Sequence, residues 1–111
     1  LNGADLRRAN LEGAYMYEVR LVGANLEGAN LRGAHLLRGR LQEADFWNAD
    51  LTSANLAETC LFGTDLSGAN LSGVSLSRAE ANQSTRWPEG VDLEAVGVIL
   101  DGTKSDIYGY C

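Results

Sequence analysis

A single histidine is the residue of this chain best suited to acid–base chemistry. His35 could activate a nucleophile only beside a Ser or Cys and an orienting Asp. If residues twenty apart stack, its neighbours are Tyr15 and Asn55, and these complete no such triad. No group of His and Cys has the spacing of a zinc site, and the glycines form no phosphate-binding motif. We therefore predict that the protein is not an enzyme and holds no metal and no cofactor.

The two cysteines leave the redox compartment open. Cys60 and Cys111 could form a disulfide only if the C-terminal tail folds back along the rest of the chain, and the sequence does not decide this. Arg20 and Arg40 offer a different chemistry, because two stacked guanidinium groups could receive an anion.

Asp and Asn residues are frequent, but they are not arranged as a cation site. A calcium ion needs several carboxylates that converge on one point. Here Asp is interleaved with Asn in two series spaced by twenty residues, splayed along flat faces. We predict that these side chains bond neighbouring backbone at corners of the chain. The two series are Asp5, Asn25, Asp45, Asp65 and Asn10, Asn30, Asp50, Asn70.

Aromatic side chains offer binding chemistry instead. If residues twenty apart stack, one face carries an exposed, partly aromatic patch near the N-terminal end. Exposed apolar clusters can mark contacts with other proteins. We take the patch as the candidate partner surface; the alternatives are surface decoration and contact with an upstream coil. The residues of this aromatic patch are Tyr15, Tyr17, His35 and Leu37.

A five-residue phrase must position all these side chains. Sixteen phrase centres follow one another from Leu1 to Leu76, and fourteen of them are Leu. A small residue, most often Ala, lies two positions before each centre. Neither an α-helix nor a straight strand places residues five apart on one face. The pattern predicts short extended segments with a corner every five residues, and Gly follows the centre by two positions in eight phrases.

The phrase Ala-(Asp/Asn)-Leu-x-x resembles that of the pentapeptide-repeat protein family, over roughly residues 1–81. The resemblance implies an all-β solenoid, a right-handed quadrilateral β-helix with four phrases per coil. Four coils are implied: Leu1–Arg20, Leu21–Arg40, Leu41–Cys60 and Leu61–Glu80. In this register, charges of alternating sign stack on one another. A structure in which Arg38 lies far from both Glu18 and Glu58 would disprove the register. The stacked series is Glu18, Arg38, Glu58, Arg78.

Residues 82–111 are predicted to cap the β-helix with an extended segment, a short α-helix at about 92–98 and a tail. Asp92 is a suitable N-cap for that helix, although Gly97 weakens it. Trp87, followed by Pro88, is the expected lid, because the last coil of a solenoid must be covered. The sequence of residues 85–92, Thr-x-Trp-Pro-x-Gly-x-Asp, is similar to the endings of family members from photosynthetic bacteria.

Composition limits the partners. The net charge of −6 argues against binding nucleic acid or anionic membrane. No apolar run is long enough to cross a membrane, and no signal peptide is visible. The family has cytoplasmic and thylakoid-lumen members, so the compartment stays open. Because Leu1 lies in mid-phrase, we expect an upstream segment or a partner to cover the first coil, and end-to-end or cap-mediated self-association is a further expectation.

The sequence thus predicts a non-enzymatic structural or protein-binding module that presents flat faces to an unidentified protein partner. The alternative comes from the quinolone-resistance branch of the family, whose resemblance implies a DNA mimic that inhibits or protects a type II topoisomerase, gyrase. That branch uses an acidic surface. In this chain the acidic residues are spread over several predicted faces and form no stripe, so we rank the binding module first.

Overall fold

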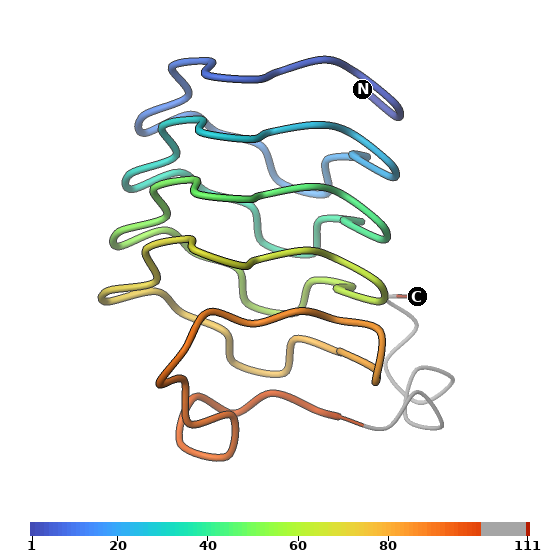
Figure 1. The fold of residues 1–111 in the computed structure, drawn as a ribbon, viewed down its shortest axis with the longest axis vertical. Helices are drawn as coiled ribbons and strands as arrows, with labels where there is room; N and C mark the ends of the chain where they lie inside the picture. Colours follow the sequence, from blue (N-terminus) through green and yellow to red (C-terminus); the bar gives the residue numbers. More distant parts are fainter. Residues whose placement is uncertain (101–110) are drawn as a thin grey trace.

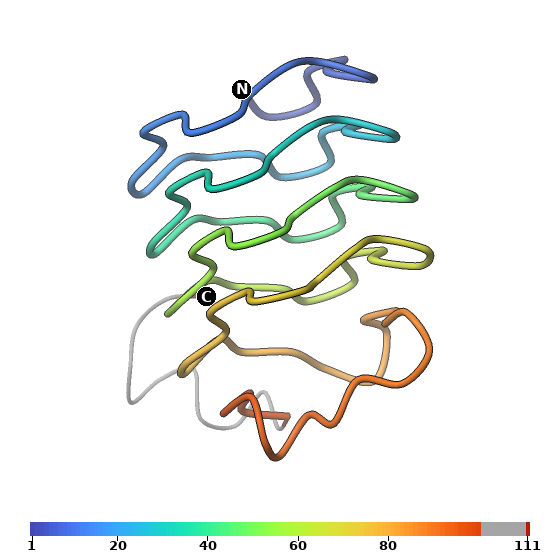
Figure 2. The same cartoon turned by 90° about the vertical axis from the view of Figure 1, so that its left-hand side faces the viewer.

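The chain winds into a stack of similar turns (Figures 1 and 2). Residues 1–100 and Cys111 are described by a computed structural model. Across these residues the regular elements are isolated parallel β-bridges, with neither an α-helix nor a continuous strand. Each side of a turn is therefore too short for more than one bridge residue, as a corner every five residues demands.

Parallel bridges join residues twenty positions apart, for example Tyr15 to His35 and His35 to Asn55. Each bridge residue from Asn25 to Asp65 pairs with both the preceding and the following turn, and with the preceding turn it makes two backbone bonds. The His35 N–H donates to the Ala14 carbonyl at 2.9 Å, and the His35 carbonyl accepts from the Met16 N–H at 2.8 Å. The twenty-residue register predicted from the sequence is confirmed.

Each phrase turns at a residue in the left-handed region. The second residue after the centre has a φ between +57° and +70° in all sixteen phrases, eight with Gly and eight with another residue. A backbone bond closes every corner but one, as where the Ala29 N–H donates to the Leu26 carbonyl at 3.0 Å. At the remaining corner the Thr59 hydroxyl donates to the Leu56 carbonyl at 2.8 Å. Gly adopts this conformation without the clash that a Cβ brings. The frequent Gly at this position therefore has a conformational cause.

The phrase centres and the small residues before them form a narrow core. The centres from Leu21 to Leu66 are wholly buried, Phe46 among them, and the Ala residues two positions earlier are buried with them. Thr64 replaces one of these Ala residues, and its buried hydroxyl donates to the Leu41 carbonyl at 2.6 Å. Burial of a Leu side chain contributes about 1.5–3 kcal/mol, so this continuous ladder is the main source of stability.

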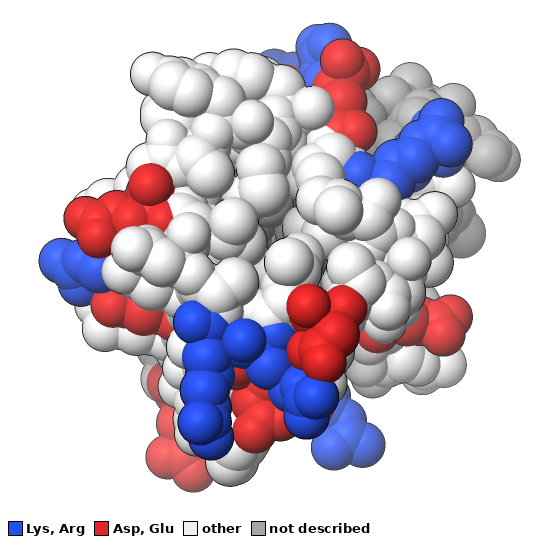
Figure 3. Space-filling view, turned by 90° about the horizontal axis from the view of Figure 1, so that it is seen from above, with Lys and Arg blue, Asp and Glu red and all other residues white. Residues whose placement is uncertain are grey.

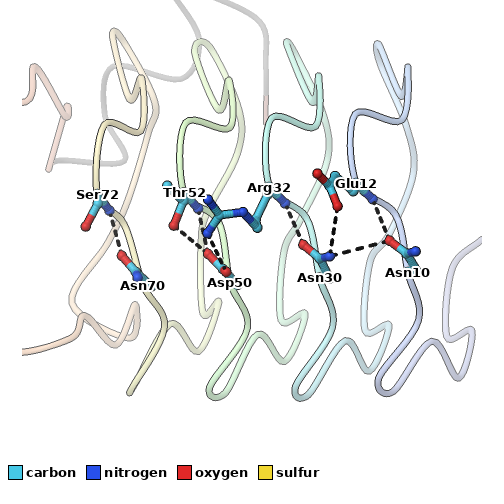
Figure 4. Close-up of polar contacts among 8 residues, drawn as sticks. All are labelled: Asn10, Glu12, Asn30, Arg32, Asp50, Thr52, Asn70 and Ser72. Atoms are coloured by element: carbon cyan, nitrogen blue, oxygen red, sulfur yellow. Dashed lines mark hydrogen bonds and ion pairs between the residues drawn. The ribbon is translucent and has the colours of Figure 1, made fainter.

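Asp and Asn side chains brace the corners. In nearly every phrase that carries one, the side-chain oxygen accepts the N–H of the residue two positions on. The Arg32 N–H donates to Asn30 at 3.1 Å, and the Ser72 N–H donates to Asn70 at 3.0 Å (Figure 4). The predicted role of these residues in backbone hydrogen bonding is confirmed. Satisfying a backbone donor in this way fixes the corner locally.

The N-terminal end of the stack is open in the described residues. Leu1 is 65% exposed, and the other centres of the first turn, Leu6, Leu11 and Met16, are only partly buried. Viewed from this end, the charged side chains lie toward the rim around an uncharged centre (Figure 3). The first turn thus buries its core on one side only.

The C-terminal residues continue the stack with an altered spacing. We call residues 81–99 the closing segment. Asp65 bridges to Arg86, twenty-one positions on, and Glu80 bridges to Ile99, nineteen positions on. Trp87 thus follows Arg86 as Leu66 follows Asp65, and it packs half-buried against the core. Between its two bridges the closing segment leaves the regular path (Figure 1).

The predicted α-helix at 92–98 is wrong, because residues 93–97 form turns. Asp92 does accept the Ala95 N–H, at 3.2 Å, as an N-cap would. Gly97 then takes a φ of +82°, and its carbonyl accepts the Arg78 N–H at 3.0 Å. Pairing with the previous turn therefore replaces helix formation.

A disulfide joins Cys60 to Cys111, with their Cα atoms 5.4 Å apart. The pairing that the sequence left open is thus present, and it ties the end of the chain to a buried position on the stack. The predicted tail otherwise lies outside the described residues. No helix in the described part is long and apolar enough to cross a bilayer.

Candidate protein-interaction site

The structure brings together three of the four residues of the aromatic patch through ring contacts. The rings of Tyr15 and His35 are stacked, with centroids 4.7 Å apart and an interplanar angle of 9°. Tyr17 leans against both, with its centroid 5.9 Å from that of His35 and 6.3 Å from that of Tyr15. Tyr15 is 78% exposed and Tyr17 53% exposed. These rings therefore form one exposed apolar surface.

The backbone register holds the patch in place. Tyr15 and His35 are bridge partners, so their side chains leave adjacent turns at the same position. Leu37 lies one turn from Tyr17, and its carbonyl accepts the Glu18 N–H at 2.9 Å. Because both turns are pinned by bonds on each side of the patch, the four side chains are presented at the regular spacing of a sheet.

A ladder of charges borders the patch. The Arg38 guanidinium lies 2.9 Å from the Glu58 carboxylate, as the predicted register requires. The Arg38 side chain is 56% exposed and that of Glu58 20% exposed. An exposed pair of this kind contributes about 0–1 kcal/mol, so it confirms the register more than it stabilises the fold.

Hydrogen bonds at the corners lower the pKa of two carboxyl groups. The Arg7 side chain donates to Asp5 and holds the Asp5 pKa at about 2. The Thr52 hydroxyl, its backbone N–H and then Arg32 lower the pKa of Asp50 (Figure 4). Both carboxylates act on their own turns and neighbours. These shifts are thus explained by structural bonds.

The other candidate chemistry remains a prediction. Arg20 and Arg40 are exposed bridge partners, which keeps the anion hypothesis geometrically open. His35 contacts the rings of Tyr15 and Tyr17. Residues 1–100 together with Cys111 contain no group of three or more His, Cys, Asp or Glu side chains that could hold a metal ion.

The expected cap residues lie near a groove that the sequence analysis missed. Pro88 is half-buried next to Trp87 and lines a hollow of about 570 Å³ between the last regular turn and the closing segment. Leu71, Val74 and Val96 also line it. In the sequence, only the end of the five-residue repeat after residue 81 pointed to this groove. The groove itself depends on the path of the irregular segment, which the repeat does not determine.

The sequence matches the family described as pentapeptide repeats, with eight copies over residues 1–36, 29–68 and 61–85. Among curated proteins, none matches at a significant level.

Solved structures give closer comparisons. A pentapeptide repeat protein from Nostoc PCC 7120, alr5209, is 39% identical with a TM-score of 0.89, over 90% of this chain and 83% of that one. HetL, from the cyanobacterium Nostoc sp. strain PCC 7120, is described as involved in heterocyst differentiation regulation. It is 34% identical with a TM-score of 0.66, over 79% of this chain and 42% of HetL.

A more distant match is QnrB1, a plasmid-mediated fluoroquinolone resistance protein. Its full-length structure is 19% identical with a TM-score of 0.38, over 95% of this chain and 71% of that one. Similarity at this level carries no argument about function.

Proposed function

The chain belongs to the pentapeptide-repeat family, and on that premise we propose that it is a non-enzymatic module that binds a protein partner through the aromatic patch. The observation that carries the proposal is the stacked pair Tyr15–His35 with Tyr17 against it, exposed on one face of a rigid stack. Tyrosine is enriched at protein interfaces because it buries a large area with few rotatable bonds. The partner is a protein, and its identity is open.

Membership implies a right-handed β-helix, and parallel bridges at a twenty-residue spacing support a four-sided one. We count four coils up to Glu80 and treat residues 82–111 as the cap, with Trp87 and Pro88 as its structural residues. A flat-sided shaft of this kind displays side chains at fixed intervals, which suits a binding role.

The disulfide bears on the compartment. Bonds such as Cys60–Cys111 persist in oxidising surroundings and are rare in a reducing cytosol. Between the cytoplasm and the thylakoid lumen, this favours the lumen. Thiol labelling of the protein taken directly from cells tests the assignment, since a cytoplasmic protein would carry both thiols in reduced form.

The test of the binding function is affinity capture from cells of the native source. Changing Tyr15, Tyr17 and Leu37 to Ser should remove a specific partner, because the shared apolar area is lost. The matched control is Trp47→Ser, which removes an aromatic side chain that is 46% exposed and follows a phrase centre as Tyr17 does. If the Ser variant of the patch retains every partner that the wild type captures, the proposal is wrong.

The alternative, a DNA mimic acting on gyrase, requires a continuous acidic surface. The Arg32–Asp50 and Arg38–Glu58 pairs interrupt the acidic residues on two faces. We therefore rank it second. Inhibition of gyrase supercoiling by low micromolar protein would reverse the ranking.

A further inference from the structure

We propose that the groove beneath the last regular turn binds an extended basic segment of a partner protein, which adds one more rung to the β-helix. This site is independent of the aromatic patch. It lies at the opposite end of the stack, where the chain changes from regular turns to the closing segment (Figure 1). Backbone groups that no described residue pairs, an apolar lining and two acidic lining residues mark this site.

Among the described residues, none makes with the backbone of Ala69–Leu76 the bonds that the same positions one turn earlier make with the following turn. The Leu51 N–H donates to the Asn70 carbonyl, and the Ala49 carbonyl accepts from the Asn70 N–H, both at 2.9 Å. No described residue pairs in this way with the Leu71 N–H or the Ala69 carbonyl. The two groups form a donor and acceptor pair with the spacing of a bridge.

The closing segment leaves this edge uncovered for a geometric reason. It pairs with the last turn at Arg86, departs at Trp87 and pairs again at Gly97 and Ile99. Within the described part of the chain, no backbone bond joins residues 88–96 to the last regular turn. The hollow of about 570 Å³ lies between that turn and the closing segment. Pockets of about 300–1,000 Å³ are typical of binding sites, so a short peptide fits.

The lining defines the occupant. Leu71, Val74 and Val96 are partly buried apolar side chains within the groove. An occupant that continues the stack therefore has a small residue under Ala69 and a large apolar residue under Leu71, as in every phrase of this chain. Strand addition of this kind uses backbone bonds for affinity and alternate side chains for specificity.

Charge completes the description. The only charged residues that line the groove, within the described part, are Glu89 and Asp92. Asp92 already accepts the Ala95 N–H, whereas the exposed Glu89 lies at the rim. The occupant's outward residues are thus expected to be Lys or Arg, and the net charge of −6 favours the same sign of partner.

The test uses the full chain with its disulfide intact and a fluorescent peptide, Ala-Lys-Leu-Lys-Gly, blocked at both ends. We expect saturable binding with a Kd below about 1 mM. Methylating the backbone nitrogen of the second residue should weaken binding about tenfold, because that N–H would bond the Ala69 carbonyl. Equal binding of the methylated peptide, or no saturation, would overturn the proposal.

Two protein variants locate the site. Ala95→Trp fills the groove from an exposed position and should abolish binding, while Ala57→Trp places the same ring on a regular turn and should leave the Kd unchanged. Thermal unfolding checks that both variants fold. If Ala57→Trp weakens binding as much, the peptide binds elsewhere. If Ala95→Trp instead dissolves a dimer seen by sedimentation, the occupant is a second copy and the proposal of a partner segment is wrong.

Discussion

The regular turns and the closing segment expose different parts of the chain. Between residues 21 and 60 the bridge residues pair their backbone with the neighbouring turns, so the sides of these turns present mainly side chains to a partner. Along the closing segment the spacing of twenty residues becomes twenty-one and then nineteen, and no described residue pairs with the Leu71 N–H. A strict repeat therefore offers recognition through side chains, whereas a break in the repeat offers recognition through the backbone.

The largest expected effect contrasts two leucines of one column. Leu51 is wholly buried, while Leu71 lies partly buried in the groove. Leu51→Ala should lower the free energy of unfolding by about 2–5 kcal/mol, because it leaves a cavity. Leu71→Ala should cost no more than about 2 kcal/mol, since water already reaches its side chain. Chemical denaturation measures both, and equal losses would show that the groove is closed in solution.

The disulfide should stabilise the molecule through the closing end. It spans 51 residues, and closing a loop of that length in the unfolded chain is worth up to about 4 kcal/mol. Cys111→Ser should lower stability by about 2–4 kcal/mol. In the Cys111→Ser variant, hydrogen exchange should be faster than in the wild type at residues 81–99 and unchanged at the first turn. Reduction of the wild type is the matched control, and an unchanged melting temperature in both would refute this role.

Charge on the regular turns should matter less. Arg38→Glu places a like charge beside Glu58 and should cost about 0–1 kcal/mol at low salt. At about 1 M salt the Debye length is near 3 Å, so the difference from the wild type should vanish. A loss that persists in salt would mean that Arg38 stabilises the turn by packing.

The smallest effect concerns acid stability. The pKa of Asp50 is lowered in the fold by its bonds to Thr52 and Arg32. Its contribution is therefore present above the ordinary value of 3.8 and is lost as the pH falls through the lowered pKa. Asp50→Asn should remove the loss of stability that protonation of Asp50 causes in acid. Asn can still accept the bond at the corner, as Asn30 and Asn70 do one turn away. Melting temperatures of both proteins between about pH 6 and pH 2 test this, and parallel curves would contradict it.

The repeat made most of the stack predictable. A centre every five residues required corners, while the twenty-residue register came from the resemblance to the pentapeptide-repeat family and was supported by the alternating charges of Glu18, Arg38 and Glu58. The Arg38–Glu58 pair and the Tyr15–His35 stack follow from that register. On a strict repeat, the register determines which side chains lie next to one another.

The closing end could not be predicted in the same way. Asp92 accepts the Ala95 N–H as an N-cap does, but no helix follows over residues 93–97. Gly97 and Ile99 pair with the previous turn instead. That pairing depends on one inserted residue before Arg86 and on the path between the two bridges. The groove follows from this path, and its one signal in the sequence was the change of phrase after residue 81. The sequence named the Cys60–Cys111 pair as possible, but spacing could not decide whether the two residues meet.

The central claim is that a protein partner rests on the aromatic patch. A photo-crosslinking side chain placed at position 37 lies in the patch, and one placed at position 57 lies one turn away in the same column. In cells of the native source, we expect one specific adduct from position 37 and little from position 57. Equal adducts from both positions, or none from position 37, would contradict it.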